Sequence, residues 1–309
     1  MIEIRPLSNH TLASDFVGVF KRLIKNQTFL TKTSPSRVLY LRPSQMPFCP
    51  TSFFINHASR GLYGLEDFGS AFYTRVGTVV HEVLQNFLSR SGQLLADYHC
   101  THCKKWHRMS YVHECCDHPT QYHEVEIDYK GIHGHIDAIY KDKEGRLWIV
   151  DFKTTSVKGA PGKKKDPGAT YREQIETYAV LVELQYGLKI AGYADAFILR
   201  DNPVTTDPVL WVRPLTDETR KRVKQRLSRY KKMHRAALDA ASKSEVLALM
   251  DWGRCKGEYC PVCSKMDDKQ VRRELLSAYN LGKNKGHVPI RGHAQRAQDK
   301  LDAEAKRRK

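Results

Sequence analysis

The chain of 309 residues is 41% hydrophobic and 28% charged, the composition of a globular protein with a core of its own. Lysine and arginine outnumber aspartate and glutamate by 51 to 34, and the net charge of +17 favours a polyanionic partner such as nucleic acid over a charge excess that only aids solubility. No apolar segment opens the chain and no run of about 18 apolar residues follows, so we expect no membrane partner and a cytoplasmic location, or a host cell's cytoplasm for a viral protein.

The first elements are helical. Within a lead-in of residues 1–42 we expect a helix over 14–25, and a second helix follows Cys49-Pro50 over 51–60. A third helix is predicted over 77–90, where it ends at Ser91-Gly92. Its apolar residues have helical spacing: Val80, Val83, Leu84, Phe87 and Leu88.

Residues 97–123 contain four cysteines and six histidines with little periodicity, which indicates a small metal-bound insertion or a disordered loop. Cys100-x-x-Cys103 is half of a tetrahedral zinc site. Adjacent cysteines do not easily reach one ion together, so Cys116 with one near neighbour is the expected second half. The candidates for the second half are Cys115, Cys116, His107, His113 and His118.

The pattern then changes to strands. Alternating apolar residues indicate strands at 125–127 and 132–140, and the apolar run at 147–152 indicates a central strand covered on both faces. A basic loop at 158–168 carries Lys163, Lys164 and Lys165. It precedes a helix over 171–186 that ends at Gly187, strands at 193–199 and 210–212, and basic helices over 219–250.

This order predicts an α/β fold, in which a mixed central sheet is flanked by helices. We expect one domain over 43–265, which contains the insertion at 97–123, the basic helices and a cysteine triplet at 255–263. A basic tail over 266–309 follows it.

A turn at 142–145 (DKEG) joins the strands 132–140 and 147–153. Folding the chain about this turn places Asp137 across from Val150 or Asp151, with Cβ atoms roughly 5 Å apart. Asp151 and Lys153 share one face of their strand because side chains alternate. Two acids and a lysine therefore converge; the alternative is an Asp–Lys ion pair on the solvated face of an ordinary hairpin.

Two neighbouring carboxylates repel each other unless a cation lies between them. Hard oxygen ligands suit Mg²⁺ or Mn²⁺ rather than zinc. Such an ion polarises a phosphodiester, and Lys153 would orient or deprotonate the attacking water and offset charge on the phosphorane. The predicted activity is metal-dependent hydrolysis of phosphodiester bonds.

Four motifs occur in order: Gly77-x-x-x-His81, Gly134-His135-Ile136-Asp137, Asp151-Phe152-Lys153-Thr154 and Gln174-x-x-x-Tyr178. Over about residues 43–265 this set resembles the RecB-like branch of the PD-(D/E)XK nucleases, which includes the AddB nuclease domain and the CRISPR-associated RecB-like exonucleases. The resemblance implies a restriction-endonuclease-like core.

The same resemblance implies roles for single residues. The metal ligands would be His81, Asp137, Asp151 and the Phe152 carbonyl, and Lys153 would be the catalytic lysine. Gln174 and Tyr178 would support the site and contact DNA. Apart from the other motifs, His81 is also consistent with a core histidine. Either Glu124 or Glu126 could add a ligand.

Residues 44–50 (SQMPFCP) resemble the opening segment of the iron–sulfur members of this branch. There one early cysteine joins three late ones around a [4Fe–4S] cluster, and Cys49 with Cys255, Cys260 and Cys263 would match. The spacing of four residues and then two departs from the more usual two and then five. An iron–sulfur cluster, zinc and reduced thiols therefore all stay open.

No base-reading motif is present, so we expect cleavage without sequence specificity. Phosphate contacts are expected from Lys163, Lys164, Lys165 and the basic helices, including Arg222. By resemblance the protein is an exonuclease on single-stranded DNA or DNA ends, acting in replication, recombination or repair with a partner protein from one of these processes. The alternatives are a structure-specific endonuclease and a non-catalytic DNA-binding or scaffold protein that retains the fold.

Overall fold

The computed structural model describes residues 29–30, 41–44, 49–59, 65–66, 68–201, 207–240, 242–253 and 266–284. The helix expected over 14–25 and the late cysteines lie outside these residues. A short strand pair, β1 (Phe29–Leu30) with β2 (Leu65–Glu66), belongs to the described part. Within the described ranges, no helix combines the length and the hydropathy needed to span a bilayer.

A seven-stranded mixed sheet forms the centre of the molecule, in the order β13-β12-β11-β10-β3-β4, with β7 also paired to β3. Strands β11 and β12 are parallel and the other neighbours are antiparallel. This sheet confirms the expected α/β class. The strands are β3 (Leu94–His99), β4 (Trp106–Ser110), β7 (Gln121–His123), β10 (Ala138–Lys141), β11 (Leu147–Thr155), β12 (Ile190–Leu199) and β13 (Val209–Pro214).

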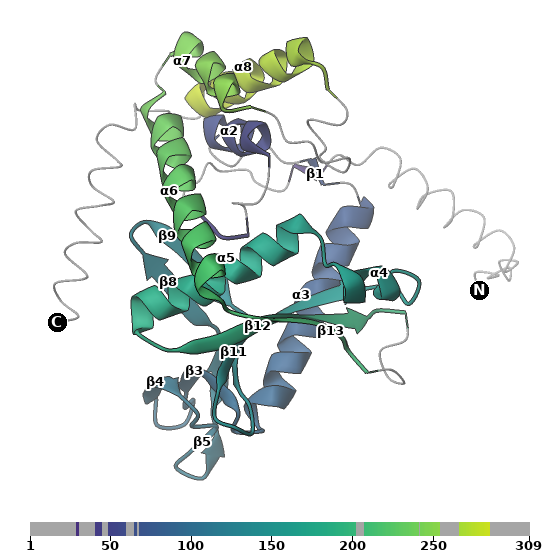
Figure 1. Ribbon diagram of the computed structural model, residues 1–309, viewed down its shortest axis with the longest axis vertical. Coiled ribbons are helices and arrows are strands. Elements are labelled where there is room, and N and C mark those ends of the chain that lie inside the picture. Colours follow the sequence, from purple (N-terminus) through teal and green to yellow (C-terminus); the bar gives the residue numbers. More distant parts are fainter. Residues whose placement is uncertain are drawn as a thin grey trace, which may run out of the picture.

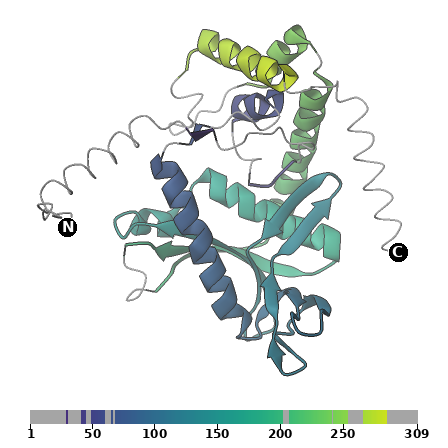
Figure 2. The same cartoon turned by 180° about the vertical axis from the view of Figure 1, so that it is seen from behind.

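Helices cover both faces of the sheet (Figures 1 and 2). Helix α3 (Phe68–Ser89) begins earlier than expected and lies on one face, where Leu84 and Leu88 pack against a small core around Phe152. Val83 and Phe87 are 47% and 67% exposed. The buried face of α3 is therefore narrower than the spacing of its apolar residues predicted. The opposite face carries α5 (Ala169–Tyr186), and α6 (Asp217–Asp239) packs on α5.

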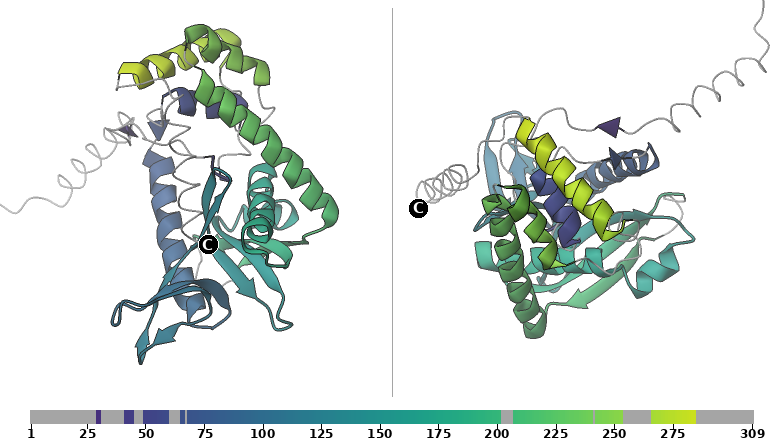
Figure 3. Two further views of the ribbon diagram at one scale, coloured as in Figure 1. Left: turned by 90° about the vertical axis from the view of Figure 1, so that its left-hand side faces the viewer. Right: turned by 90° about the horizontal axis from the view of Figure 1, so that it is seen from above.

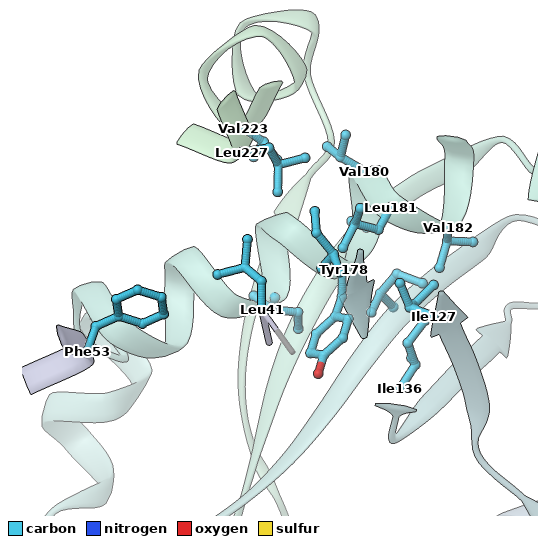
Figure 4. Close-up of a cluster of buried hydrophobic side chains, with 14 of the residues drawn as sticks. Leu41, Phe53, Ile127, Ile136, Tyr178, Val180, Leu181, Val182, Val223 and Leu227 are labelled. Atoms are coloured by element: carbon cyan, nitrogen blue, oxygen red, sulfur yellow. The ribbon is translucent and has the colours of Figure 1, made fainter. Parts of the chain in front are cut away.

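The larger core lies on the α5 side. Helix α5 is buried without interruption from Ile175 to Val182, because the β8–β9 hairpin, the sheet and α6 enclose it. Figure 4 shows Tyr178 of α5 near Ile127 and Ile136 of that hairpin, and Val180 facing α6. The two hairpin strands are β8 (Val125–Tyr129) and β9 (Ile132–Ile136).

A helical cap brings segments far apart in sequence together (Figure 3). It contains α2 (Pro50–Ala58), α7 (Lys243–Ala248), η1 (Leu249–Trp252) and α8 (Asp268–Asn284). The rings of Phe54 and Trp252 lie 6.5 Å apart, and the Thr51 hydroxyl donates a hydrogen bond to the Gly253 carbonyl at 3.4 Å. The chain after η1 therefore returns to the start of α2.

Two segments differ from expectation. Residues 97–123 form the β3–β4 hairpin, the short pair β5 (Glu114–Cys115) with β6 (His118–Pro119), and β7, so this insertion is not a disordered loop. The basic loop contains a short helix, α4 (Ala160–Lys165), because Pro161 in its first turn fits a helix start.

Candidate active site

Asp137 lies at the junction of two hairpins. The strand expected over 132–140 is divided there, since β9 pairs with β8 whereas β10 pairs with β11. Extending the register Ala138↔Val150 by one residue sets Asp137 opposite Asp151, in agreement with the sequence prediction. Extending Val125↔Ile136 in the same way sets Glu124 opposite Asp137. Three acids therefore meet where the two hairpins separate.

Hydrogen bonds hold Asp137 through both its side chain and its backbone. Its Oδ2 accepts from the Phe152 amide at 2.7 Å and lies 3.4 Å from Nδ1 of His81 on α3. Its carbonyl accepts from the Tyr122 hydroxyl at 2.6 Å and from Gln85 Nε2 at 3.1 Å. These contacts fix the position of Asp137.

His81, Glu124 and Asp137 each offer one ligand atom, and the three atoms lie within 4.8 Å of one another. Gln85 Nε2 also donates to Glu124 Oε1 at 2.8 Å, so one amide orients two members of the group. Burial raises the pKa of Glu124, the hydrogen bond from Gln85 opposes this, and the Asp137 carboxylate adds to it. Carboxylate oxygens with one imidazole fit a divalent cation, whose charge would relieve this repulsion.

Asp151, Lys153 and Gln174 form a second group beside the first. Asp151 is 5% exposed; its Oδ1 accepts from Gln174 Nε2 at 3.3 Å and its Oδ2 contacts the Lys153 ammonium. Burial raises the pKa of Asp151 to about 6, although Lys153 opposes the shift. Burial lowers the pKa of Lys153, but Asp151 and Asp137 outweigh burial and raise it. Lys153 therefore stays protonated beside these two acids.

Tyr178 on α5 and Gly77 on α3, two further residues of the predicted motifs, differ in how closely other atoms approach them. Tyr178 is buried, and a Cβ on residue 134 would lie 2.7 Å from its hydroxyl, so Gly134 permits this close approach. Burial, with the charges of Asp151 and Asp137, raises the pKa of Tyr178. A Cβ on Gly77 would meet no described atom within 4 Å, which leaves room one turn before His81.

Two residues of this region were not identified from the sequence. Gln85 lies four residues after His81 on α3, and this i, i+4 spacing is a signal that could have found it. Asp195 on β12 is the register partner of Asp151 and is fully buried. Neither Asp195 oxygen has a hydrogen-bond partner among the described residues, and burial together with the Asp151 charge raises its pKa to about 7.

The cysteines of the insertion converge. The sulfurs of Cys100, Cys103, Cys115 and Cys116 lie within 4.8 Å of one another, with Cys100–Cys116 at 3.5 Å and Cys103–Cys115 at 3.6 Å. Tetrahedral zinc with Zn–S bonds of about 2.3 Å separates its sulfurs by roughly 3.8 Å, so the geometry fits one such ion. The amide of Cys103 donates to the Cys100 sulfur at 3.5 Å and lowers the pKa of that thiol to about 6.

The expectation that Cys115 and Cys116 would not converge together is wrong. Cys116 and Asp117 have φ values of 46° and 61°, and this left-handed turn brings both sulfurs to the same place. No histidine belongs to the four-sulfur group. His102 and His118 form a second, exposed group with Cys116.

Cys49 is buried and immediately precedes the first residue of α2. Its expected partners Cys255, Cys260 and Cys263 lie outside the described residues. The contact of Thr51 with Gly253 brings the chain, two residues before Cys255, next to this helix start.

Of the expected phosphate-binding residues, two are exposed and two make hydrogen bonds within the protein. Lys164 and Lys165 are exposed, whereas Lys163 donates to the Pro167 carbonyl at 2.8 Å. Arg222 donates to the buried carboxylate of Glu176 at 2.7 Å and keeps a side chain that is 47% exposed.

Comparison with known proteins identifies the family. Residues 105–264, just over half of the chain, match the family model described as the PD-(D/E)XK nuclease superfamily. The chain therefore belongs to this superfamily. No curated protein sequence matches it.

Two solved structures are similar to parts of the chain. The crystal structure of LHK-Exo in complex with dAMP is 11% identical with a TM-score of 0.40, and the match covers 65% of this chain and 91% of that one. The crystal structure of SSO0001 is 14% identical with a TM-score of 0.34, covering 83% and 98% respectively.

Proposed function

We propose that the protein is a divalent-metal-dependent deoxyribonuclease of the RecB-like branch, which cuts DNA without sequence specificity. The observation that carries this proposal is the position of Asp137 between Glu124 and Asp151, with His81 3.4 Å away and Lys153 on the neighbouring acid. Two hairpins and a helix converge on these groups, within a chain of the PD-(D/E)XK superfamily.

In this proposal His81, Glu124 and Asp137 hold Mg²⁺ or Mn²⁺, with Asp151 and the Phe152 carbonyl completing the set. The donor chemistry supports this choice, since hard oxygens predominate and no cysteine of the described residues joins this group. When bound, the ion would polarise the phosphodiester and stabilise charge on the departing oxygen. The hydrogen bond from the Phe152 amide keeps Asp137 oriented toward that position.

Lys153 acts on the phosphate in our proposal. It is 18% exposed and its ammonium contacts Asp151, so it presents a fixed positive charge where negative charge develops on the phosphorane. Gln174 donates a hydrogen bond to the other oxygen of Asp151 and so fixes the position of this acid relative to Lys153. Tyr178, packed against Gly134, supports the hairpin.

The substrate is proposed to be single-stranded DNA or DNA ends, with exonuclease action ahead of structure-specific endonuclease action. The net charge of +17 and the exposed Lys164 and Lys165 support binding to a phosphate backbone. The four ordered motifs support the RecB-like branch, in which roles in replication, recombination and repair are found.

Two further metal centres belong to the proposal. The four-sulfur group of the insertion would hold structural zinc, supported by its spacing of 3.5 and 3.6 Å within pairs. Cys49 would join Cys255, Cys260 and Cys263 around a [4Fe–4S] cluster, with zinc as the alternative. The contact between Thr51 and Gly253 supports this closure.

The test compares wild type with Lys153→Ala on linear and circular single-stranded DNA and on open and end-blocked duplexes, with Mg²⁺ or Mn²⁺. We expect Lys153→Ala to abolish cutting while DNA binding persists. Lys143→Ala, in the exposed turn of the same hairpin, is the matched control and should cut normally. Equal cutting by Lys153→Ala would refute the assignment. A wild type that binds but never cuts would instead support the non-catalytic scaffold.

A further inference from the structure

A groove opens beside the candidate metal site. Its volume is about 410 Å³, within the range of small-molecule pockets. Gln85, Glu124 and Tyr122 line the groove, and all three belong to the surroundings of Asp137. Trp106 and Arg108 of β4 also belong to the lining. A molecule in this groove would therefore lie directly next to the phosphate at the metal site.

Planar side chains belong to the lining of the groove: Trp106 and Arg108 of β4 and His123 of β7. Trp106 is 41% exposed, and its ring lies 4.6 Å from that of His99 and 4.8 Å from that of His123. The guanidinium of Arg108 lies 4.2 Å from the Trp106 ring centroid. Aromatic rings and guanidinium planes are the groups on which unstacked nucleobases stack.

The charges of the groove favour a base over a phosphate. Arg108 is paired with Asp97, so its charge is neutralised within the groove. Glu124 is assigned to the metal in the proposed function, and Glu126 adds one further carboxylate to the lining. Carboxylates repel phosphate but accept hydrogen bonds from the N–H groups on base edges.

The cysteine group forms the turn that precedes Trp106, and this turn positions the wall of planar side chains formed by Trp106, His123 and Arg108. The Cys100 amide donates to the Lys105 carbonyl at 2.9 Å, which closes a loop containing Cys103. Trp106 follows the loop directly and is the register partner of His99. Both short hairpins of the insertion lie at one end of the sheet (Figure 1). An ion bound by the four sulfurs would fix this turn and with it the orientation of Trp106.

We propose that the groove is a nucleobase subsite, in which the wall of Trp106, His123 and Arg108 stacks the base next to the cleaved phosphodiester, and that the cysteine-bound ion holds this wall in place. The identity of the ligand as DNA rests on the proposed function. A base inside a duplex has no open face, so the subsite takes single-stranded DNA or an unpaired end.

The test measures binding of fluorescent oligothymidylates to full-length Lys153→Ala protein. A series of oligonucleotides carries one abasic residue at successive positions. We expect an abasic residue at one position beside the cleavage site to weaken binding about 10-fold. In Lys153→Ala/Trp106→Leu protein that positional penalty should vanish, whereas Trp106→Phe should retain it. Trp148→Phe is the control: Trp148 lies on β11 and donates a hydrogen bond to Asp142 in the β10–β11 turn. This substitution should leave the profile unchanged.

Cys103→Ser in the Lys153→Ala background should flatten the positional profile as Trp106→Leu does, with unchanged far-ultraviolet circular dichroism. A positional penalty that survives Trp106→Leu would overturn the subsite, and one that survives Cys103→Ser would overturn the role of the cysteine-bound ion. Failure of the proposed function is separate, because it would appear as wild-type protein that shows the abasic profile but does not cut.

Discussion

Asp151 and Asp195 are register partners on the parallel strands β11 and β12, and both are buried. Asp151 contacts Lys153 and Gln174, whereas neither oxygen of Asp195 has a hydrogen-bond partner among the described residues. Lys153 therefore contacts Asp151 and leaves Asp195 without a direct partner among the described residues. The unmatched charge is a stability cost that the protein carries next to its candidate active site.

Asp195→Asn should stabilise the protein at alkaline pH. The pKa of Asp195 is raised to about 7 from 3.8, so its ionisation opposes folding above the lower value, and fully so above the higher one. Removing the charge should raise the free energy of unfolding by roughly 2 kcal/mol at pH 8, after the cost of burying an amide. The gain should shrink as pH falls toward 5. Urea unfolding without added divalent metal measures this; a less stable variant at pH 8 would mean that the ionised carboxylate has a partner.

Glu124→Gln should weaken the response to Mg²⁺ and Mn²⁺. The amide keeps the hydrogen-bonding capacity toward Gln85 but removes the charge of one proposed ligand. We expect the metal concentration for half-maximal cleavage to rise about 10-fold or more. Glu126→Gln, two residues further along and exposed, should leave it unchanged. Identical metal titrations for the two variants would remove Glu124 from the ligand set.

Local turn chemistry explains which part of the site was predictable. The turn at 142–145 sets the β10–β11 register, so the approach of Asp137 to Asp151 followed from counting residues. The second hairpin has an equally readable turn, in which Lys130 and Gly131 have φ values of 51° and 82°. The same count from that turn places Glu124 opposite Asp137, and this step could have selected Glu124 over Glu126.

Other features depend on tertiary packing and could not be read locally. Asp195 reaches Asp151 through a parallel pairing across a helical crossover, and no short-range pattern sets that register. The convergence of Cys115 with Cys116 depends on two left-handed residues that are not glycine. The ion pair of Arg222 with Glu176 joins α6 to α5, and composition alone indicated only a basic helix.

Glu176→Ala should strongly destabilise the fold. Glu176 is 1% exposed and accepts from Arg222 at 2.7 Å, Arg226 at 3.2 Å and Tyr193 at 3.2 Å. Its removal leaves the 12%-exposed side chain of Arg226 without this buried counter-charge, at a cost of about 3 kcal/mol. Glu183→Ala is the control; its pair with Arg220 is more exposed and should cost about 1 kcal/mol. Thermal or urea unfolding distinguishes them, and equal losses would show that burial of Glu176 does not set its contribution.

Metal analysis should separate the two cysteine sets. Anaerobically purified protein should contain about one zinc and about four irons per chain, with absorbance near 400 nm. Cys103→Ser should lose the zinc and keep the iron, since Cys103 belongs to the four-sulfur group and its side chain is exposed. Cys260→Ser should lose the iron and keep the zinc, so each variant controls for the other. Two zincs and no iron would replace the proposed cluster by a second zinc site. Loss of both metals in either variant would contradict two independent centres.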